Sequence, residues 1–400
     1  MHVLVIGGTQ FIGRATVSAL LSHGHNVTVL NRGRTPNPFG SCVRVAQCNR
    51  REQPEVLLAV LRETGGWDAV IDFLAFEPSD VAPIIEAGAC CMRRYILIST
   101  DSIYMAVSPE HYVKSPAGAL LESSDANGRA DPARARDDEY GADKLSTEVA
   151  LRAAAEKSDS SGSNNRAMPP MVALRLPDVV GPYENTGRLE KLLLKLLKGR
   201  RVGALINDHQ PAAGNSLISV VAAADVASAV CAALEQSLTS RLWCGHSASS
   251  DLASSGDTSS GGKLSALHVC ADEKVSWPEL VCLFDAALRQ HESLDVPALR
   301  LDASRDSGFV SVDCGALDNG LAKACLDWAP APLEQRVLES VDWWLAEMRA
   351  GFERISSHTQ PHPLVEVEVE TAPQQPPQAE EMRQEEASNK RKVPPEPEAN

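Results

Sequence analysis

A glycine-rich segment close to the N-terminus, Gly7-Gly8-Thr9-Gln10-Phe11-Ile12-Gly13, constrains the fold of this chain more than any other part of it. It follows a short apolar run at residues 3–6 and opens a stretch at 10–23 whose apolar residues recur at helical spacing. Glycines in such a turn let a diphosphate approach the backbone, and the last glycine lets the helix pack closely on the strand. The free N–H groups and the helix dipole then favour phosphate. The segment predicts a βαβ unit that binds a dinucleotide; the alternative is a glycine-rich turn that holds no ligand.

Strands and helices alternate through the first hundred residues. Apolar runs without polar alternation predict strands at 3–6, 26–30, 42–46, 69–73 and 95–99, with helices at 10–23, 54–63 and 81–90 between them. A further strand is expected at 171–176. Strands of this kind are buried on both faces, as in a parallel sheet covered by helices on both sides. We therefore expect an α/β fold: a doubly wound parallel sheet of the Rossmann type, with a smaller C-terminal α/β part and a disordered C-terminal tail.

The sequence suggests three parts. Residues 1–170 are expected to form the NAD(P)-binding domain, whose sheet is completed by 171–182. Residues 183–355 are expected to bind the substrate and to contain helices at 188–197, 223–234, 277–288 and 333–348, and a low-complexity, mobile loop at 247–262. The tail at 356–400 is rich in proline and glutamate, so it cannot bury enough apolar surface to offset chain entropy.

The amino-acid composition argues against several kinds of binding partner and location. The chain has 400 residues, 38 of them basic and 53 acidic, and the resulting net charge of −15 disfavours nonspecific binding to nucleic-acid phosphates. No run of about 18 apolar residues occurs, which argues against a membrane span. A strand begins almost at the first residue and leaves no room for a signal peptide, so a cytoplasmic location is expected. The ten cysteines are scattered without a C-x-x-C pair, so we expect reduced thiols and no metal site.

Asn31-Arg32-Gly33-Arg34 ends the second predicted strand. In a dinucleotide-binding unit an acidic residue at this place holds the ribose 2′-hydroxyl of NAD. Here no acid is present, and two guanidinium groups could meet the 2′-phosphate of NADP instead. The segment favours NADP over NAD as cofactor; the alternative is that both arginines simply face solvent.

A tyrosine and a lysine four residues apart, Tyr140 and Lys144, lie near the start of a helix predicted from about residue 137. This spacing places both side chains on one helical face. A phenol is a poor base at neutral pH, but a neighbouring ammonium group would lower its pKa. Tyr140 could then move a proton on or off a substrate hydroxyl while hydride passes to or from nicotinamide, and Lys144 could hold the nicotinamide ribose. The alternative is an exposed, inert helical pair.

The hydroxyl residues after the strand at 95–99 are a second candidate element. Ligands bind at the carboxyl ends of parallel strands in this architecture. A hydroxyl there could orient the substrate oxygen towards Tyr140, and we select Thr100 over Ser99 and Ser102. The alternative is a set of turn residues that cap the strand.

Together these segments resemble the extended short-chain dehydrogenase/reductase superfamily and, within it, the NAD-dependent epimerase/dehydratase group, over roughly residues 1–350. The likeness rests on the glycine segment, Asp72-Phe73-Leu74-Ala75, residues 99–104 and the Tyr140/Lys144 pair; residues 175–182 and 276–280 match two further segments of that group. The resemblance implies a catalytic set of Thr100, Tyr140 and Lys144. Tyr140 and Lys144 are also expected at the cofactor, together with Gly7, Gly8, Gln10, Phe11, Ile12, Gly13, Asn31, Arg32, Leu74 and Ala75.

Two departures from the group bear on activity. Gln10 stands where the group usually has a further glycine, and Ser102 replaces the glutamate of the sugar-nucleotide dehydratases, which argues against 4,6-dehydration. The form GGT-x-FIG looks closest to a branch that includes chloroplast stem-loop-binding proteins, which use this fold to bind RNA.

Two hypotheses follow. The first is an NAD(P)-dependent oxidoreductase or epimerase that acts on a secondary alcohol, such as that of a nucleotide sugar. The resemblance to the superfamily, which often dimerises through two helices including the one that carries Tyr140, makes a homodimer possible but leaves the oligomeric state open. The second is an RNA-binding or nucleotide-binding scaffold with little or no catalysis. The intact Tyr140/Lys144 pair and the acidic net charge favour the first.

Overall fold

The computed structural model describes residues 1–128, 130–161, 167–202, 217–240, 242–243, 264–291 and 314–358. The chain divides into two units, Met1–Arg349 and Ala350–Asn400, and the elements that build the candidate site lie in the first. The predicted mobile loop at 247–262 lies outside the described residues, as does the predicted tail beyond residue 358. No helix in the described ranges is both long enough and apolar enough to cross a membrane.

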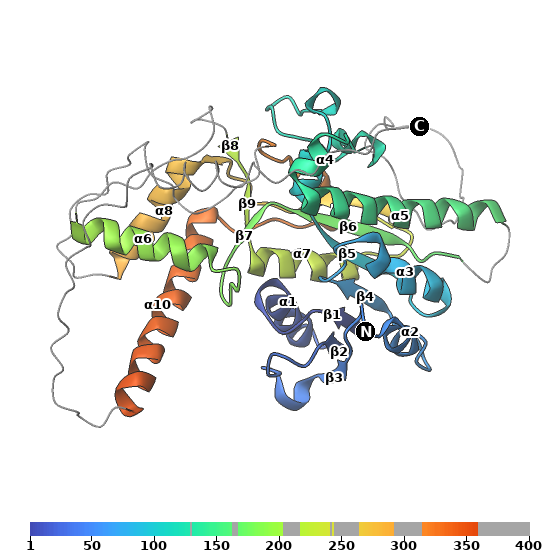
Figure 1. Cartoon of the computed structure of the whole chain (residues 1–400), viewed down its shortest axis with the longest axis horizontal. Helices are drawn as coiled ribbons and strands as arrows, with labels where there is room; N and C mark the ends of the chain where they lie inside the picture. Colours follow the sequence, from blue (N-terminus) through green and yellow to red (C-terminus); the bar gives the residue numbers. More distant parts are fainter. Residues whose placement is uncertain are drawn as a thin grey trace, which may run out of the picture. The chain divides into compact units, whose positions relative to one another are not determined.

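One parallel sheet of seven strands forms the centre of the first unit, in the order β10-β6-β5-β4-β1-β2-β3 (Figure 1). The chain runs outward from β1 to β3 and then returns to β4 on the other side of β1. The order therefore reverses between β1 and β4, and ligands of such sheets bind at that point, outside the carboxyl ends of the strands. The strands are β1 (His2–Ile6), β2 (Asn26–Asn31), β3 (Arg44–Gln47), β4 (Ala69–Asp72), β5 (Tyr95–Thr100), β6 (Met171–Leu176) and β10 (Leu264–His268).

Helices cover both faces of this sheet, as the uniformly apolar strands predict. One face packs against α1 (Phe11–Ser22), α7 (Ala223–Glu235) and α9 (Gly320–Leu326). The other face packs against α2 (Pro54–Leu61), α3 (Pro78–Ala87) and α5 (Glu139–Ser161). Successive residues of β1 alternate between the two cores, with Val3 and Val5 in the first and Leu4 and Ile6 in the second. The predicted doubly wound fold is confirmed.

A separate core joins the later elements of the unit. Side chains of α6 (Arg188–Val202), α8 (Trp277–Gln290) and the first part of α10 (Leu333–His358) surround Trp277 and Phe284. Two small sheets adjoin them: β7 (Asp178–Val180) pairs with β9 (Val220–Ala222), and β8 (Leu217–Ile218) pairs with β11 (Val275–Ser276). The remaining short elements are α4 (Arg134–Asp137) and the 3₁₀ helices η1 (Gly40–Cys42), η2 (Gly88–Cys90), η3 (Asp101–Ala106), η4 (Pro109–His111) and η5 (Glu122–Gly128).

Element boundaries differ from the predictions in two instructive places. The helix expected at 81–90 begins at Pro78, because Glu77 and Asp80 form a capping box around that start. The helix expected to end at residue 348 continues to His358, so residues 356–358 are helical rather than part of the predicted disordered tail. Gly351 lies in that extension, and a glycine inside a helix costs only about 1 kcal/mol, which does not by itself end the helix.

Candidate functional site

The glycine segment between β1 and α1 is packed so tightly that side chains are excluded. Gly7 has a φ of +96°, and a Cβ there would lie 2.7 Å from Cγ of Leu74. A Cβ on Gly8 would lie 2.7 Å from Cγ2 of Val17, and one on Gly13 would lie 2.1 Å from the carbonyl oxygen of Gly7. All three glycines are therefore required by the turn itself, as predicted from the sequence.

The start of α1 is arranged to receive an anion. Its N-cap residue, Gln10, makes no side-chain capping bond within the described part of the chain, and the first turn carries no acidic residue. The Gln10 side chain instead accepts a hydrogen bond from Nδ2 of Asn185, at 3.0 Å. Phe11 is buried and has a φ of +42°, in the left-handed region that non-glycine residues seldom adopt outside functional sites. A helix start without a capping side chain, next to the two glycines Gly7 and Gly8, fits a diphosphate group.

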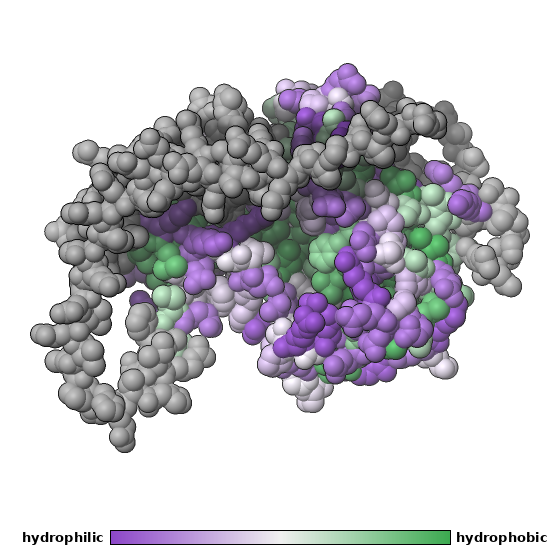
Figure 2. Space-filling view, in the orientation of Figure 1, coloured by the Kyte–Doolittle hydropathy of each residue, from purple (hydrophilic) through white to green (hydrophobic). Residues whose placement is uncertain are grey.

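The residues after β2 have two different roles. Asn31 is buried, and its Oδ1 accepts a hydrogen bond from the backbone N–H of Gly33 at 2.7 Å, so its side chain shapes the turn. Arg32 and Arg34 are exposed. Figure 2 shows a largely hydrophilic surface over β2 and β3. The two guanidinium groups thus lie at the surface beside the end of β2, which is where an adenosine ribose is expected in this architecture.

A buried ion pair fixes the loop that follows β4. Asp72 accepts hydrogen bonds from Nη1 of Arg50 at 2.7 Å and from the hydroxyl of Tyr95 at 3.0 Å. The same carboxylate accepts from the backbone N–H of Leu74 at 2.9 Å. Leu74 is thereby held over Gly7, so the end of β4 and the glycine turn are in direct contact.

Thr100 ends β5 and is the strand-end hydroxyl that reaches Tyr140. Its Oγ1 accepts a hydrogen bond from the backbone N–H of Ser102 at 3.2 Å, and its hydroxyl lies near enough to the phenol of Tyr140 to act on the pKa of that phenol. The Ser99 hydroxyl points elsewhere and donates to Oε1 of Glu148 at 2.7 Å. Thr100 rather than Ser99 therefore lies beside Tyr140, and its selection as a catalytic residue stays a prediction.

Two local features bring Tyr140 to this position. The carboxylate of Asp138 accepts a hydrogen bond from the N–H of Gly141 at 2.9 Å and so caps α5 at the turn that carries Tyr140. Gly141 packs against η3, since a Cβ there would lie 2.1 Å from the carbonyl oxygen of Ser102. Only glycine allows the helix start to approach the end of β5 so closely. Sequence reasoning did not identify Gly141, although its place directly after Tyr140 is visible in the sequence.

The protonation of Tyr140 differs from the prediction. The residue is 48% exposed, but desolvation at its hydroxyl end raises its pKa to about 12. The nearby carboxylate of Asp101 adds to the rise, while the hydrogen bond from Thr100 and the positive charge of Arg188 oppose it. The expectation that Lys144 lowers this pKa was wrong for the protein without ligand. The phenol is therefore fully protonated at neutral pH.

Lys144 is directed into the protein. It is 2% exposed, and its Nζ donates hydrogen bonds to the carbonyl oxygens of Ala75 at 2.9 Å and of Ile98 at 2.8 Å. Burial lowers its pKa to about 8. An ammonium group carries three N–H donors, so in the described structure these two carbonyls leave one donor for a ligand.

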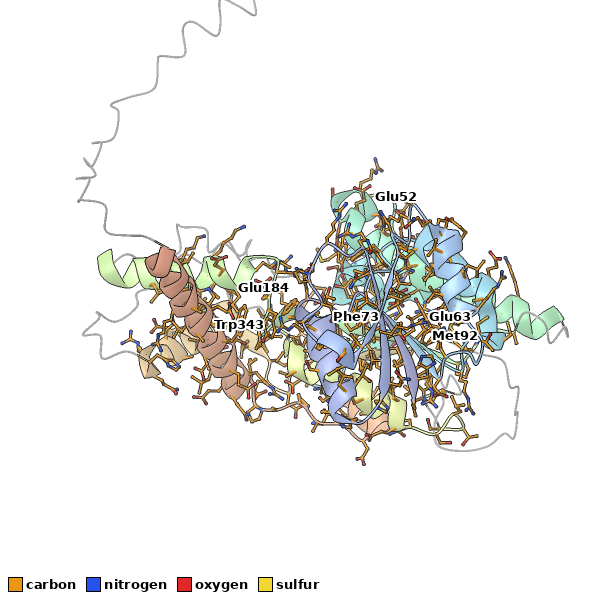
Figure 3. The ribbon with its side chains drawn as sticks, turned by 90° about the horizontal axis from the view of Figure 1, so that it is seen from below. Glu52, Glu63, Phe73, Met92, Glu184 and Trp343 are labelled. Carbon is orange, nitrogen blue, oxygen red and sulfur yellow. The ribbon has the colours of Figure 1, made fainter. Side chains whose placement is uncertain are left out.

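Four contacts of aromatic rings with other rings or with charged groups were not predicted from the sequence. Phe76 is 38% exposed, and its ring lies 6.4 Å from the Tyr140 ring and 5.0 Å from Nζ of Lys144. The guanidinium of Arg14, in the first turns of α1, stacks 3.4 Å from the ring centroid of Tyr183. The Tyr183 ring packs 5.3 Å from that of Trp343, and Figure 3 shows the next residue, Glu184, beside this contact. These pairs join distant parts of the chain, which local spacing does not reveal.

A buried acid lies next to the catalytic candidates. Asp101 is buried at the start of η3, and burial together with the negative charge of Asp178 raises its pKa well above the usual range. Asp178 pairs with Arg188 at 2.9 Å. Among the described residues, no group of three His, Cys, Asp or Glu side chains is placed to hold a metal ion.

Arg175, which opens the segment at 175–182, does not reach the site. Its guanidinium is fully buried and donates to both carboxylate oxygens of Glu148. It also donates to the hydroxyl of Tyr104 at 2.9 Å. This arginine therefore links β6 to α5 and η3 and stabilises the elements that carry the site residues.

Comparison with known proteins gives a family match and several distant relatives. The model of the NAD dependent epimerase/dehydratase family matches residues 3–242. A chloroplast stem-loop binding protein of 41 kDa (b) from Arabidopsis thaliana is 28% identical over 151 residues, which cover 31% of the chain and 39% of that protein. A 2′-dehydrokanamycin reductase from Streptomyces kanamyceticus is 29% identical over 154 residues, which cover 38% of each chain. The matches thus span less than half of either relative.

Solved structures confirm the fold. The UDP-glucose 4-epimerase of Thermus thermophilus, in complex with NAD, superimposes with a TM-score of 0.59 at 18% identity, over 86% of this chain and 99% of that one. At this identity the similarity concerns the fold alone.

Proposed function

Because the chain belongs to the NAD dependent epimerase/dehydratase family, we propose that it is an NAD(P)-dependent oxidoreductase or epimerase acting at a secondary alcohol, or the matching ketone, of a small molecule such as a nucleotide sugar. Two similar proteins support this substrate class: one relative is named as a 2′-dehydrokanamycin reductase, and one structural neighbour as a UDP-glucose 4-epimerase.

One observation carries the proposal: the hydroxyl of Thr100 and the phenol of Tyr140 lie close together at the carboxyl end of β5. The glycine turn follows β1, and β4 alone separates β1 from β5 in the sheet. All three strands are parallel, so the turn and the hydroxyl pair lie at the same edge. A cofactor held by its diphosphate at the turn would have its other end near this pair.

The residues present fit such a cofactor, and their roles follow from their contacts. The turn and the first N–H groups of α1 would hold the diphosphate. The remaining donor of Lys144 would bind a ribose hydroxyl of the cofactor. Nicotinamide, when bound, supplies or accepts hydride. Tyr140 would exchange a proton with the substrate oxygen, and Thr100 would orient that oxygen through its hydroxyl.

We further propose that NADP is preferred over NAD, because Arg32 and Arg34 are exposed beside the end of β2. Arg32→Ala should weaken NADPH binding and leave NADH binding unchanged. Equal weakening for both cofactors, or for neither, would argue against a contact to the 2′-phosphate.

Cofactor binding and catalysis can be tested separately. Quenching of tryptophan fluorescence by NADH and NADPH measures binding, and absence of binding for both would remove the enzyme proposal. Tyr140→Phe should keep cofactor affinity and lose about 100-fold in rate on a ketone or alcohol substrate found by screening nucleotide sugars. Tyr112→Phe is the matched control, since the Tyr112 hydroxyl donates to the carbonyl oxygen of Tyr104 at 2.7 Å and lies outside the proposed machinery.

A second function is favoured by one observation, the similarity to the chloroplast stem-loop binding protein. An RNA-binding scaffold on this fold would not need the Tyr140/Thr100 contact, and the net charge of −15 opposes binding to phosphates. Filter binding with structured RNA over a salt series tests it. Tight retention that weakens steeply with salt would support the scaffold over the enzyme.

A further inference from the structure

Two neighbouring cysteines place their sulfur atoms on the same side of the chain. Sγ of Cys90 and Sγ of Cys91 lie 3.6 Å apart, and both are free thiols. Neighbouring side chains point to opposite faces of a strand and lie about 100° apart on a helix, so the sulfurs of adjacent residues seldom touch. Here the backbone N–H of Cys91 donates to the carbonyl oxygen of Gly88 at 3.3 Å, and this tight turn at the end of η2 brings the two thiols together.

The two thiols differ in their access to solvent. Cys90 is exposed, and its Sγ lies 2.9 Å from the carbonyl oxygen of Ala87. Cys91 is 8% exposed and packs in the core on the α2 and α3 face of the sheet, and burial together with the Cys90 thiol raises its pKa to about 11. A reagent in solution therefore reaches Cys90 first, and Cys91 reacts with a group that is already attached to its neighbour.

The pair lies at the amino-terminal edge of the central sheet. The carbonyl oxygen of Cys91 accepts a hydrogen bond at 2.8 Å from the backbone N–H of Trp67, which shortly precedes β4. Met92, labelled in Figure 3, follows the pair and shortly precedes β5. The glycine turn and Thr100 follow the carboxyl ends of β1 and β5, and these strands are parallel to β4. The pair therefore lies at the opposite edge of the sheet from the proposed cofactor site.

The contact between the sulfurs decides which nucleophile attacks a modified Cys90. At pH 7 a thiol with a pKa of about 11 is ionised in about one molecule in 10,000, whereas an ordinary thiol of pKa about 8.5 is ionised to about 3%. A group held at near-attack distance, however, reacts as though it were present at about 10⁵ M, while a free thiol competes at millimolar concentration. The neighbouring Cys91 is therefore the faster nucleophile, even when strain in the small ring removes several powers of ten.

We infer that Cys90 and Cys91 form a modification site at which a low-molecular-weight disulfide, such as oxidised glutathione, converts the two thiols into a disulfide between neighbouring residues. The Cys90 thiolate first attacks one sulfur of the small disulfide, whose S–S bond breaks, and one glutathione leaves as its thiolate. The Cys91 thiolate then attacks the Cys90 sulfur and displaces the second glutathione. The two protein thiols lose two electrons and two protons, and the small disulfide takes up both to become two thiols. The inference does not depend on the proposed function.

Mass spectrometry of one tryptic peptide tests the inference on the full chain. Residues 63–93 contain no internal lysine or arginine, and Cys90 and Cys91 are their only cysteines. The reduced protein is treated with oxidised glutathione at about pH 8, and the remaining thiols are then blocked with iodoacetamide. Most of this peptide should become about 2 Da lighter than its reduced form and carry no label. Cys282, an exposed thiol on α8 without a cysteine next to it in the sequence, is the matched control and should keep a glutathione adduct instead.

Two substitutions test the order of the steps. In Cys91→Ser the second step cannot occur, so Cys90 should keep its glutathione, with an adduct at least about 10-fold more abundant than in the wild type. In Cys90→Ser the buried Cys91 should stay unmodified over the same time. Cys91→Ala replaces Cys91→Ser should the latter fail to fold, with the same expected adduct.

Three results would overturn the inference. The first is a glutathione adduct on Cys90 of the wild type at the level seen in Cys91→Ser, and the second is a disulfide from either cysteine to another position of the chain. The third is an unmodified pair under conditions that modify Cys282, which would mean that the two thiols only pack as small apolar groups. Failure to bind NADH or NADPH would instead remove the proposed function and leave this measurement standing, so the two failures are distinguishable.

Discussion

Replacing Gly13 with alanine tests the close approach between β1 and α1 on which the proposed cofactor site depends. The new Cβ would lie 2.1 Å from the carbonyl oxygen of Gly7. Unstrained carbon–oxygen contacts are about 3.3 Å or longer, so the two must separate by about 1 Å. The helix cannot simply retreat, because Val17 and Leu20 on its inner face are fully buried in the core shared with α7.

The size of the effect on the free energy of unfolding follows from two contributions. Overpacking a closed site costs about 1–3 kcal/mol, and the upper end applies here because backbone rather than a flexible side chain obstructs the Cβ. Alanine offsets about 1 kcal/mol through its higher helix propensity. We therefore expect Gly13→Ala to lower the free energy of unfolding by about 2 kcal/mol. A shift of about 1 Å in the turn should in addition reduce turnover by about 100-fold.

Urea unfolding followed by tryptophan fluorescence gives the first quantity, and titration with NADH and NADPH reports on the turn. Gly24→Ala is the matched control at the other end of α1. Its φ is +74° and its Cβ would meet nothing within 4 Å, so we expect a loss of about 1–2 kcal/mol from backbone strain alone and unchanged cofactor affinity. Wild-type stability and affinity in Gly13→Ala would refute the close approach.

Three further predictions concern ionisation and hydrogen bonding. The affinity for cofactor should fall as the pH rises through about 8, because Lys144 then loses a proton and with it the N–H donor that is not bound to the carbonyls of Ala75 and Ile98. Dissociation constants at pH 7 and pH 9 measure this change, and Lys144→Met should abolish the difference between them. Burial raises the pKa of Glu122 from 4.5 to about 7, so the contribution of protonated Glu122 to stability is fully present below the lower value and is lost as the pH rises through the upper one. Glu122→Gln keeps the acceptor for the backbone N–H of His268 and should stabilise the protein at pH 8 by at most about 3 kcal/mol but not at pH 4, as measured by urea unfolding. Thr100→Val should lower the rate by about 10- to 100-fold with little change in cofactor affinity, and an unaffected rate would show that the hydroxyl beside Tyr140 is dispensable.

The fold could be predicted because the relevant signals are local. Strands such as β1 and β4 carry apolar runs, Val3 to Ile6 and Ala69 to Ile71, without polar alternation, and helices separate them; a sheet covered on both faces accommodates such strands. The glycine turn could be predicted for the same reason, since the strand, the turn and the helix are adjacent in the sequence. Helix ends were less predictable: the capping box at Glu77 and Asp80 moved the start of α3, and α10 continues through Gly351.

The environment of the site residues could not be predicted in the same way. The position of Phe76 against Tyr140 and Lys144 depends on how β4 and α5 meet, and these elements are more than sixty residues apart. The stacking of Arg14 on Tyr183 joins parts of the chain still further apart. Arg175 shows the reverse: its segment resembles part of the family pattern, but its side chain binds the buried carboxylate of Glu148 and does not reach the site. Sequence patterns thus predicted the residues of a candidate site but not the charge state within it.

Helix α5 shows why a correct spacing led to a wrong pKa. Residues at intervals of four share a helical face, but each interval also advances about 6 Å along the axis. Tyr140 lies at the rim and is 48% exposed, whereas Lys144 is 2% exposed and Glu148 is fully buried, where it binds Ser99 and Arg175. Along these two turns the side chains on this helical face change from half exposed to fully buried. The long side chain of Lys144, in the middle, can reach towards either end. Because carbonyl oxygens at the ends of β4 and β5 lie within its reach, the ammonium binds there, and the phenol above it keeps its proton.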